Sequence, residues 1–337
     1  MKAVAYFNSL PTDHHESLQD IELPAPVPGP RDLLVEVRAI SVNPVDTKVR
    51  RNTQPEGGQP KVLGWDAAGV VVGVGSEVSL CKVGDEVFYA GSIARAGAYS
   101  EQHLVDERIV GRKPQSLGFA EAAALPLTSI TAWELLFDRL QLAEGQGSGQ
   151  QLLIVGAAGG VGSIMLQLAR QLTDVTVIAT ASRPETQAWV RELGAHHVID
   201  HSQPLYDQLQ RAGFASVSHV ASLTHTDRHF DQLVEALAPQ GRLSLIDDPA
   251  QPLDVMKLKR KSLSLHWELM FTRALFETPD MIEQHNLLQR VSELVDRGVL
   301  RTTLGEHFGT INATNLRRAH ALLESGKAKG KIVLEGF

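Results

Sequence analysis

The chain has 337 residues, which is enough for about two domains. Its hydrophobic content of 43% and charged content of 21% are ordinary for a globular protein. The formal charge of −7 argues against a general binder of nucleic acid or other polyanions.

The N-terminal stretch, "MKAVAYFNSLPTDHH", lacks the long apolar region of a signal peptide. No apolar run approaches the roughly 20 residues needed to cross a bilayer. Cys81 is the only cysteine, which excludes an intrachain disulfide and a cysteine-rich zinc cluster. We therefore expect a cytoplasmic protein that has neither a membrane nor a nucleic-acid partner.

Residues 1–125 have the pattern of short strands separated by turns. "LLVEVRAISV" (33–42) and "GVVVGVGSEV" (69–78) are rich in apolar and β-branched residues, and "VGDEVFYA" (83–90) adds a turn and a strand. A proline-rich loop precedes the first of these at 24–30, and a loop rich in glycine and proline lies between the first two at 54–60. This pattern predicts a mostly β domain of the partly open barrel type.

From residue 151 onward, short apolar strands alternate with helical patterns. One such helix is "PETQAWVRELG", where Gly194 suits a left-handed C-terminal cap. Alternation of this kind predicts an α/β domain with a parallel, doubly wound sheet. The expected strands are 152–156, 175–180, 197–200, 217–222, 241–247 and 262–269.

A glycine cluster joins the first of these strands to a helix, in "LLIVGAAGGVGSIMLQLAR" (152–170). Glycines in this context permit a tight turn, close approach of a pyrophosphate to the main chain, and close packing of helix on strand. The helix N-terminus offers free N–H groups to phosphates. The sequence therefore predicts a dinucleotide site, whose candidate residues are Gly156, Gly159, Gly160, Val161 and Gly162.

Together with this turn, "PLTSITAWELLF" (126–137) and "GKAKGKIVL" (326–334) resemble the medium-chain dehydrogenase/reductase superfamily, and within it the quinone oxidoreductase branch. "KRKSLSLHWELMFTR" (259–273) resembles a bacterial subgroup labelled zinc-type alcohol dehydrogenase-like. The resemblance implies a GroES-like catalytic domain at 1–125, a Rossmann domain at 126–270, and a return to the catalytic domain at 271–337. It also implies a homodimer, which agrees with an exposed apolar edge strand at 262–270.

Zinc ligands are missing at the positions where the zinc-dependent members of the superfamily carry them. Against those members, the first ligand cysteine falls on Asn43, and the His-Glu pair falls on Trp65 and Asp66. Tryptophan cannot ligate zinc, and the lobe with four structural cysteines is missing. We therefore expect no metal. The remaining histidine groups, which we interpret as solvated surface residues, are His14 with His15, and His196 and His197 with His201.

Without a Lewis acid, a quinone or a conjugated enone is an easier hydride acceptor than a carbonyl that needs strong polarisation. By resemblance, Asn43 and Asp46 in "NPVD" line the nicotinamide pocket. Alternatively, Asn43 is a turn residue before Pro44, and Asp46 caps the helix that begins "TKVR" (47–50). Lys48 stands where the branch often has a tyrosine, and is either a proton donor or a solvated lysine.

Two further residues match the superfamily in other segments. Thr128 matches a hydroxyl that contacts the cofactor. Tyr99, in "GAYSE", either edges the active cleft or is a buried core aromatic residue.

NADPH is the expected cofactor, because the second strand of the Rossmann domain lacks the acidic residue that usually accepts from an NAD ribose. Ser182 and Arg183 stand there instead, and a guanidinium can bind a 2′-phosphate. Ser182 and Glu185 also fit a capping box, with Pro184 in the first helical turn.

The prediction is a zinc-independent, NADPH-dependent reductase of a small electrophile, either a quinone or an α,β-unsaturated carbonyl. An alcohol or aldehyde oxidoreductase of the same superfamily is the nearest alternative. A noncatalytic binding protein on this fold is the other, since fold alone does not establish function.

Overall fold

The computed structural model describes residues 1–337 and contains two compact units. The first unit is Met1–Ile130 with Phe271–Phe337, and the second is Thr131–Met270, so the second is an insertion within the first. No helix is long and apolar enough to cross a membrane.

The first unit contains ten strands and five complete α-helices, and a sixth α-helix runs from it into the second unit. The strands are β1 (Lys2–Tyr6), β2 (Gln19–Glu22), β3 (Asp32–Val42), β4 (Lys61–Val62), β5 (Ala67–Val74), β6 (Glu86–Tyr89), β7 (Gln102–Asp106), β8 (Val110–Arg112), β15 (Leu304–His307) and β16 (Lys331–Glu335). The helices are α1 (Pro44–Asn52), α2 (Phe119–Ala123), α3 (Pro126–Trp133, which runs into the second unit), α8 (Thr272–Phe276), α9 (Glu283–Asp296) and α10 (Ala313–Glu324).

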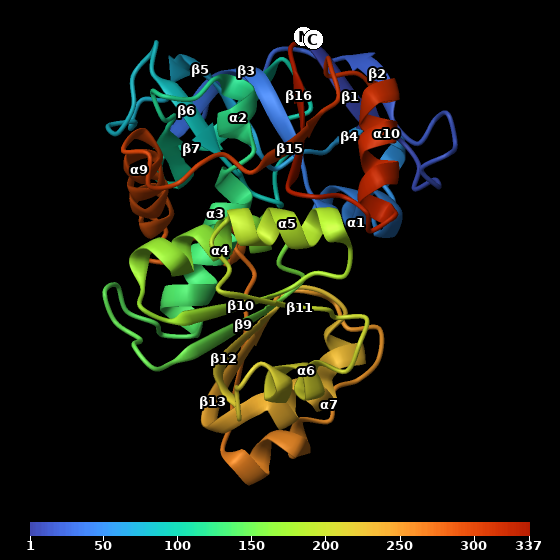
Figure 1. The fold of residues 1–337 in the computed structure, drawn as a ribbon. Helices are drawn as coiled ribbons and strands as arrows, with labels where there is room; N and C mark the ends of the chain where they lie inside the picture. The colour runs from blue at the N-terminus through green and yellow to red at the C-terminus, as the bar shows by residue number, and fades with distance from the viewer. The chain divides into compact units, whose positions relative to one another are not determined.

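β3 is the central strand of the first unit. It pairs antiparallel with β5, β7 and β16, within the order β15-β16-β3-β5-β6-β8, and β2-β1-β4 form a separate sheet. Leu33, Val35 and Val37 are buried, and the residues between them are partly exposed, as expected of an antiparallel sheet with one face on the core. Figure 1 shows β16 beside β3, although the two strands come from opposite ends of the chain. The predicted mostly β domain is confirmed.

The second unit is built on six strands, β9 (Gln151–Val155), β10 (Thr176–Thr180), β11 (His197–Ile199), β12 (Val217–Ser222), β13 (Leu237–Leu245) and β14 (Ser264–Trp267). All are parallel, in the order β11-β10-β9-β12-β13-β14. The helices are α4 (Gly160–Leu172), α5 (Pro184–Glu192), α6 (Leu205–Arg211) and α7 (Thr226–Ala236).

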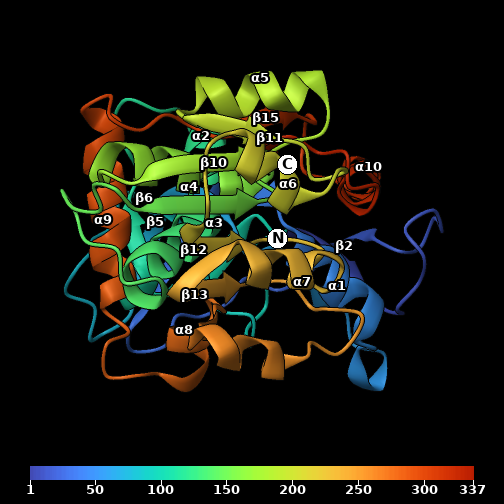
Figure 2. The same ribbon diagram turned by 60° about the horizontal axis from the view of Figure 1, so that its bottom comes forward.

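After β9, the chain adds β10 and then β11 on one side of β9. It then crosses to the other side of β9 and adds β12, β13 and β14. Because crossovers between parallel strands are right-handed, α4 and α5 lie on one face of the sheet and α6 and α7 on the other (Figures 1 and 2). This is the strand order of a dinucleotide-binding domain. The predicted doubly wound sheet is confirmed.

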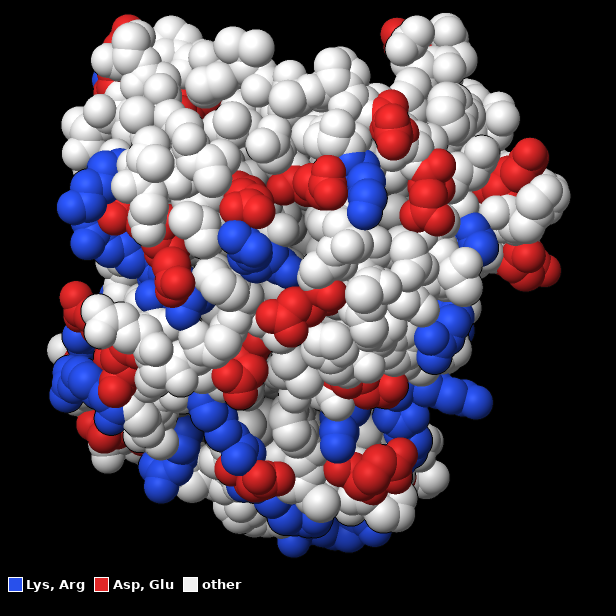
Figure 3. All heavy atoms as spheres, turned by 90° about the horizontal axis from the view of Figure 1, so that it is seen from above, with Lys and Arg blue, Asp and Glu red and all other residues white.

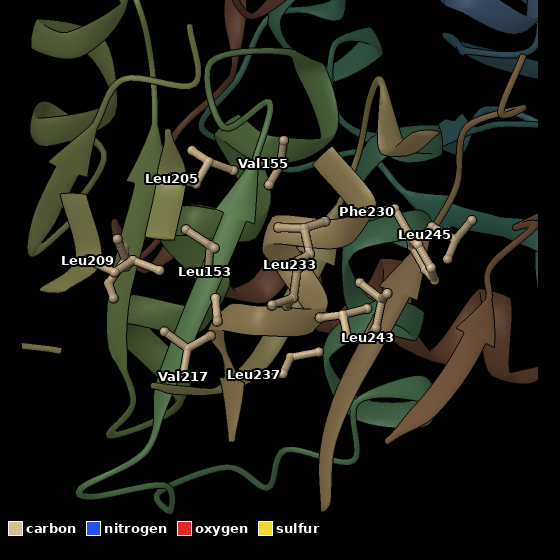
Figure 4. Close-up of a cluster of buried hydrophobic side chains, with 14 of the residues drawn as sticks. Leu153, Val155, Leu205, Leu209, Val217, Phe230, Leu233, Leu237, Leu243 and Leu245 are labelled. Atoms are coloured by element: carbon tan, nitrogen blue, oxygen red, sulfur yellow. The ribbon is translucent and has the colours of Figure 1, made fainter. Parts of the chain in front are cut away.

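A cluster of buried aliphatic and aromatic side chains holds α6 and α7 against this sheet (Figure 4). Leu153 and Val155 of β9 meet Leu209 of α6 and Leu233 of α7 in this cluster. Full burial of each such side chain contributes roughly 1.5–3 kcal/mol. The packing fixes the direction of β9, and therefore the place where the glycine turn begins.

β14 is one of the two edge strands of the sheet, because it pairs only with β13. Trp267 at its end is 54% exposed, and Leu269 just beyond it is 52% exposed.

Elsewhere on the surface, positive and negative side chains lie interspersed over most of the face shown in Figure 3. That face therefore presents no broad field of one sign.

Candidate active site

The glycine turn between β9 and α4 depends on main-chain geometry. Gly156 has φ +80, which side chains rarely permit, and its N–H donates to Thr180 Oγ1 at 3.0 Å. A Cβ on Gly162 would lie 2.5 Å from Ala157 Cα, so only glycine allows α4 to approach this closely. A Cβ on Gly159 would meet nothing closer than Gly156 O at 3.5 Å, which leaves that position open to a ligand.

The first turn of α4 is the part of the helix that faces outward. Gly159, Gly160 and Val161 are partly exposed, whereas Gly162 and the residues that follow as far as Ala169 are buried. No side chain caps the helix at Gly159. Free N–H groups and the positive end of the helix dipole favour an anion there. The turn also lies where the strand order reverses, which is where open α/β sheets bind ligands.

Ser182 and Arg183 follow β10, the neighbour of β9, as predicted, but the cap of the next helix differs from the prediction. Pro184 takes the first helical position, because it lacks an N–H, and Arg183 becomes the N-cap. Thr186 Oγ1 accepts from Arg183 N–H at 3.3 Å and donates to Arg183 O at 2.9 Å. The predicted capping box of Ser182 with Glu185 is therefore wrong by one residue.

The Arg183 side chain lies at the surface of the second unit. Its Nε is 3.0 Å from Glu185 Oε1, and the two side chains are 36% and 58% exposed. A pair this exposed is worth little, so the guanidinium can exchange Glu185 for an anionic ligand at small cost.

Asn43 lies in a fully buried polar group of the first unit. Its Nδ2 donates to Asp66 Oδ2 at 3.0 Å, and its Oδ1 accepts from Lys331 Nζ. Lys331 Nζ also lies 3.2 Å from Asp66 Oδ2, and Asp66 Oδ1 accepts from Leu127 N–H at 3.1 Å. Burial raises the pKa of Asp66 and lowers that of Lys331, and each opposes the shift of the other.

Asp46 lies beside this group, at the third position of α1. Its Oδ2 accepts from the main-chain N–H of Asn43 at 2.7 Å, so Asp46 is the third-position residue of a capping box whose N-cap is Asn43. The alternative that Asp46 caps a helix beginning at Thr47 is wrong, because the helix begins at Pro44, whose ring suits the first helical position. Asp46 Oδ2 also accepts from Tyr99 OH at 3.0 Å. Burial raises the pKa of Asp46 to about 7, although the hydrogen bonds from Asn43 and Tyr99 lower it.

Tyr99 is fully buried, so its hydroxyl faces polar groups inside the first unit. The hydroxyl also lies 3.3 Å from His320 Nε2, and His320 Nδ1 accepts from Arg50 Nε at 3.2 Å. Sequence analysis missed Arg50, His320 and Lys331. Residues 270 or more positions away from their partners carry no local signal of such contacts.

The other candidate residues of the first unit lie on two helices. The Thr128 hydroxyl is buried and donates to Leu125 O at 3.2 Å. Lys48 lies partly buried on α1.

The residues at the zinc-ligand positions do not fit a tetrahedral zinc site. Trp65 is buried, and its indole N–H donates to Ser92 O at 3.0 Å. Asn43 Oδ1 already accepts from a cation, Lys331. No group of three or more His, Cys, Asp or Glu side chains is arranged to hold a metal ion. We therefore derive no chemistry through zinc.

The histidines interpreted from the sequence as surface residues lie at the surface: His15, His196 and His197 are exposed, and His14 and His201 are partly exposed. His14 and His15 stack on each other with ring centroids 4.8 Å apart. His196 Nδ1 accepts from the Val177 N–H at 2.9 Å, and His197 packs edge-on against Phe214.

Two family models match the chain. The alcohol dehydrogenase GroES-like domain matches residues 29–132, and the zinc-binding dehydrogenase domain matches residues 193–334. A zinc-type alcohol dehydrogenase-like protein of Staphylococcus aureus is 37% identical over 336 residues, 99% of each chain. A quinone oxidoreductase of Pseudomonas aeruginosa is 32% identical over 313 residues, 91% of this chain and 92% of that one.

Solved structures agree with these matches. A Rhizobium etli protein, provisionally assigned as a zinc-dependent alcohol dehydrogenase, superposes with a TM-score of 0.96 at 60% identity, covering 100% of this chain and 98% of that one. Escherichia coli quinone oxidoreductase, solved with NADPH, superposes with a TM-score of 0.84 at 26% identity, covering 99% and 100%. The resemblance inferred from the sequence motifs is confirmed: the chain belongs to the medium-chain dehydrogenase/reductase superfamily and is an oxidoreductase.

Proposed function

We propose that this protein is a zinc-independent, NADPH-dependent reductase of quinones or α,β-unsaturated carbonyls. The observation that carries the proposal is the state of the zinc-ligand positions. They hold an asparagine and an aspartate bound to Lys331, and a tryptophan that can only donate. An oxidoreductase built this way lacks the Lewis acid that polarises an alcohol or a simple carbonyl.

The proposed substrates follow from this chemistry. A dihydronicotinamide supplies a hydride, and a quinone or enone delocalises the incoming electron pair over its conjugated system. The protein then needs to orient the two reactants and to manage one proton. The relationship to quinone oxidoreductases from two bacteria supports the same substrate class.

Asn43 and Asp46 are the residues proposed to serve the hydride-transfer site. Asn43 is held by Asp66 and Lys331, which leaves its amide little freedom. Asp46 has a pKa of about 7, raised by burial, so near neutral pH it exchanges a proton readily. Lys48 is a second candidate for the proton donor, whereas Tyr99 acts through Asp46.

NADPH is proposed for two features of the second unit. The glycine turn, Gly156 to Gly162, has the geometry to bind a pyrophosphate at the α4 N-terminus. Ser182 and Arg183 follow the adjacent strand, and no carboxylate stands at the strand end to accept from a ribose 2′-hydroxyl.

The test is an assay of NADPH and NADH oxidation with a panel of quinones, enones, aldehydes and alcohols, on protein whose zinc content is measured by elemental analysis. We expect turnover of quinones or enones with NADPH, no stoichiometric zinc, and no effect of a chelator. Activity confined to alcohols or aldehydes, with one zinc per chain, would favour the alternative oxidoreductase. A panel that is entirely inert, with the cofactor still bound, would favour a binding protein.

We also propose a homodimer formed through β14. The strand has an unpaired edge, and Trp267 and Leu269 leave apolar surface exposed beside it. Light scattering at micromolar concentration should give twice the mass of the 36.7 kDa chain. A monomeric mass would contradict the proposal.

A further inference from the structure

We propose that Arg50, His320 and Tyr99 form a directed chain of hydrogen bonds that fixes the exchangeable proton of Asp46 on its Oδ1 atom. The three are positioning residues, since each acts through the next. The inference rests on the proposed function in one respect, the placing of Asp46 at the hydride-transfer site. All the residues of this chain of hydrogen bonds belong to the first unit.

The direction of the chain is set at Arg50. A guanidinium has only donors, so Arg50 Nε–H must donate to His320 Nδ1, at 3.2 Å. The Arg50 side chain is fully buried, and its other nitrogens donate to Leu10 O at 2.6 Å, to Thr12 Oγ1 and to Glu324 Oε1 at 2.6 Å. These bonds hold the guanidinium in place, so Nδ1 of His320 is always an acceptor.

His320 passes this direction to Tyr99. Burial and the Arg50 charge lower the pKa of His320 to about 3, so the ring is neutral at ordinary pH and carries one N–H. Because Nδ1 accepts, the hydrogen is on Nε2, which donates to the Tyr99 hydroxyl oxygen at 3.3 Å. The single Tyr99 O–H is then left to donate to Asp46 Oδ2, at 3.0 Å. Burial and Asp46 raise the pKa of Tyr99 well above its usual value, so it keeps this proton.

The two oxygens of Asp46 consequently differ. Oδ2 accepts from both Tyr99 and the Asn43 main chain, whereas Oδ1 is fully buried and has no hydrogen-bond partner. A proton on the carboxyl group therefore belongs on Oδ1. The charged groups that also act on Asp46 are Lys331 on β16, which favours ionisation, and Asp66, which opposes it.

The chain gives Asp46 a defined role in the proposed reduction. A bound dihydronicotinamide would supply two electrons to the acceptor as hydride, and Asp46 would supply the proton, so that its Oδ1–H bond would break as the reduced acceptor gains hydrogen. The carboxylate that remains would be stabilised by the Asn43 N–H and the Tyr99 O–H. Because Oδ1 is fully buried, the carboxyl group must become accessible for its proton to reach the acceptor and for solvent to replace that proton. Tyr99 thus favours the charged form and limits how far burial raises the pKa of Asp46.

The test compares Tyr99→Phe and His320→Phe with wild type and Asp46→Asn. Carboxylic acid absorption is followed by infrared difference spectroscopy during a pH titration, and kcat is measured over the same pH range. Wild type should show a buried carboxyl titrating near neutral pH that Asp46→Asn lacks. Tyr99→Phe should move that midpoint, and the fall of kcat, upward by roughly one to two pH units, the equivalent of one hydrogen bond to a charged group. His320→Phe should move both in the same direction by less.

Tyr89→Phe is the matched control. Tyr89 is buried in the same unit and its hydroxyl pairs with a histidine, His103, at 3.1 Å, but it has no contact with Asp46. Its substitution should leave the midpoint unchanged.

The possible outcomes separate the two proposals. If Asp46→Asn abolishes the titration but Tyr99→Phe and His320→Phe leave the midpoint unchanged, the inference is overturned and the proposed function stands. If the infrared midpoint shifts as expected but Asp46→Asn leaves the kcat profile intact, the chain is supported and the role of Asp46 in the reaction is lost. Because Tyr99→Phe removes a single oxygen, the test does not depend on His320→Phe folding.

Discussion

The glycine turn of the second unit and the buried polar group of the first unit are built in opposite ways. The turn occupies seven consecutive residues, 156–162, and depends on main-chain geometry and the absence of side chains. The polar group here includes the adjacent pair of Asp46 and Tyr99. It depends on the charges and hydrogen bonds of its side chains, which are those of Asn43, Asp46, Asp66, Tyr99 and Lys331. The comparison shows that the two regions should respond to different mutations. The turn should be sensitive to added side-chain volume, and the polar group to the loss of a charge or a hydrogen bond.

The largest effect is expected in the polar group, from Lys331→Met. The substitution leaves the Asp66 carboxylate and Asn43 Oδ1 buried without their cation, which costs about 3–5 kcal/mol. Chemical denaturation should show this loss. Adding Asp66→Asn removes the unpaired charge and keeps an oxygen for the Leu127 N–H, so the double variant should regain much of the stability. Additive effects of the two substitutions would contradict the assignment of a coupled pair.

The stability of the glycine turn should instead depend only on the size of any side chain added to it. Gly162→Ala places a methyl group 2.5 Å from Ala157 Cα, and we expect a loss of about 3 kcal/mol, the upper end for overpacking, because main-chain atoms must move. Dinucleotide binding, measured by calorimetry, should be lost with it.

Gly159→Ala separates folding from binding in the same turn. The added methyl group meets only Gly156 O at 3.5 Å, and φ is −73, so thermal stability should be retained. Affinity for the dinucleotide should still fall, because the methyl group lies at the open helix N-terminus. Unchanged affinity would show that the pyrophosphate does not approach this turn.

Arg183→Ala tests whether the charge of Arg183 contributes to the proposed dinucleotide site. A hydrogen bond to a charged group contributes about 1.5–3 kcal/mol, so binding of 2′-phospho-ADP-ribose should weaken about ten- to 150-fold. ADP-ribose, which lacks the 2′-phosphate, should bind wild type and variant alike. Equal losses for both ligands, or equal affinities of wild type for both, would exclude Arg183 as a 2′-phosphate ligand.

The polar residues should also give the free energy of unfolding a pH dependence, which is caused by Asp46. Its folded pKa is about 7, above the unfolded value of 3.8, so the folded state holds the proton more tightly. The resulting stabilisation is fully present below about pH 4 and decreases by roughly 1.4 kcal/mol per pH unit until the folded pKa is reached. Asp46→Asn removes this term.

The variant should therefore gain stability relative to wild type as pH rises from about 4 to 7. Denaturation at several pH values gives the difference directly. Parallel curves for the two proteins would show that Asp46 ionises normally in the folded state.

The sequence alone determined the fold class and the position of the glycine turn between β9 and α4. Strand periodicity and glycine spacing are local properties, and the strand expected at 217–222 is found at those residues as β12. Gly194 has φ +108, as its predicted role as a C-terminal cap requires. The N-terminal cap of α5 was misplaced by one residue, because two local rules compete at Pro184 and its preference for the first helical position prevails.

Only the tertiary structure decided the surroundings of the polar residues. Tyr99 was equally compatible with a cleft and with a core until the contacts with Asp46 and His320 placed its hydroxyl. Lys331 lies at the start of β16, and its pairing with Asp66 arises from the antiparallel register of β16 on β3 and of β3 on β5. Hydrogen bonds and ion pairs between residues far apart in the chain depend on that register and on burial, and neither leaves a mark in the local pattern of residues.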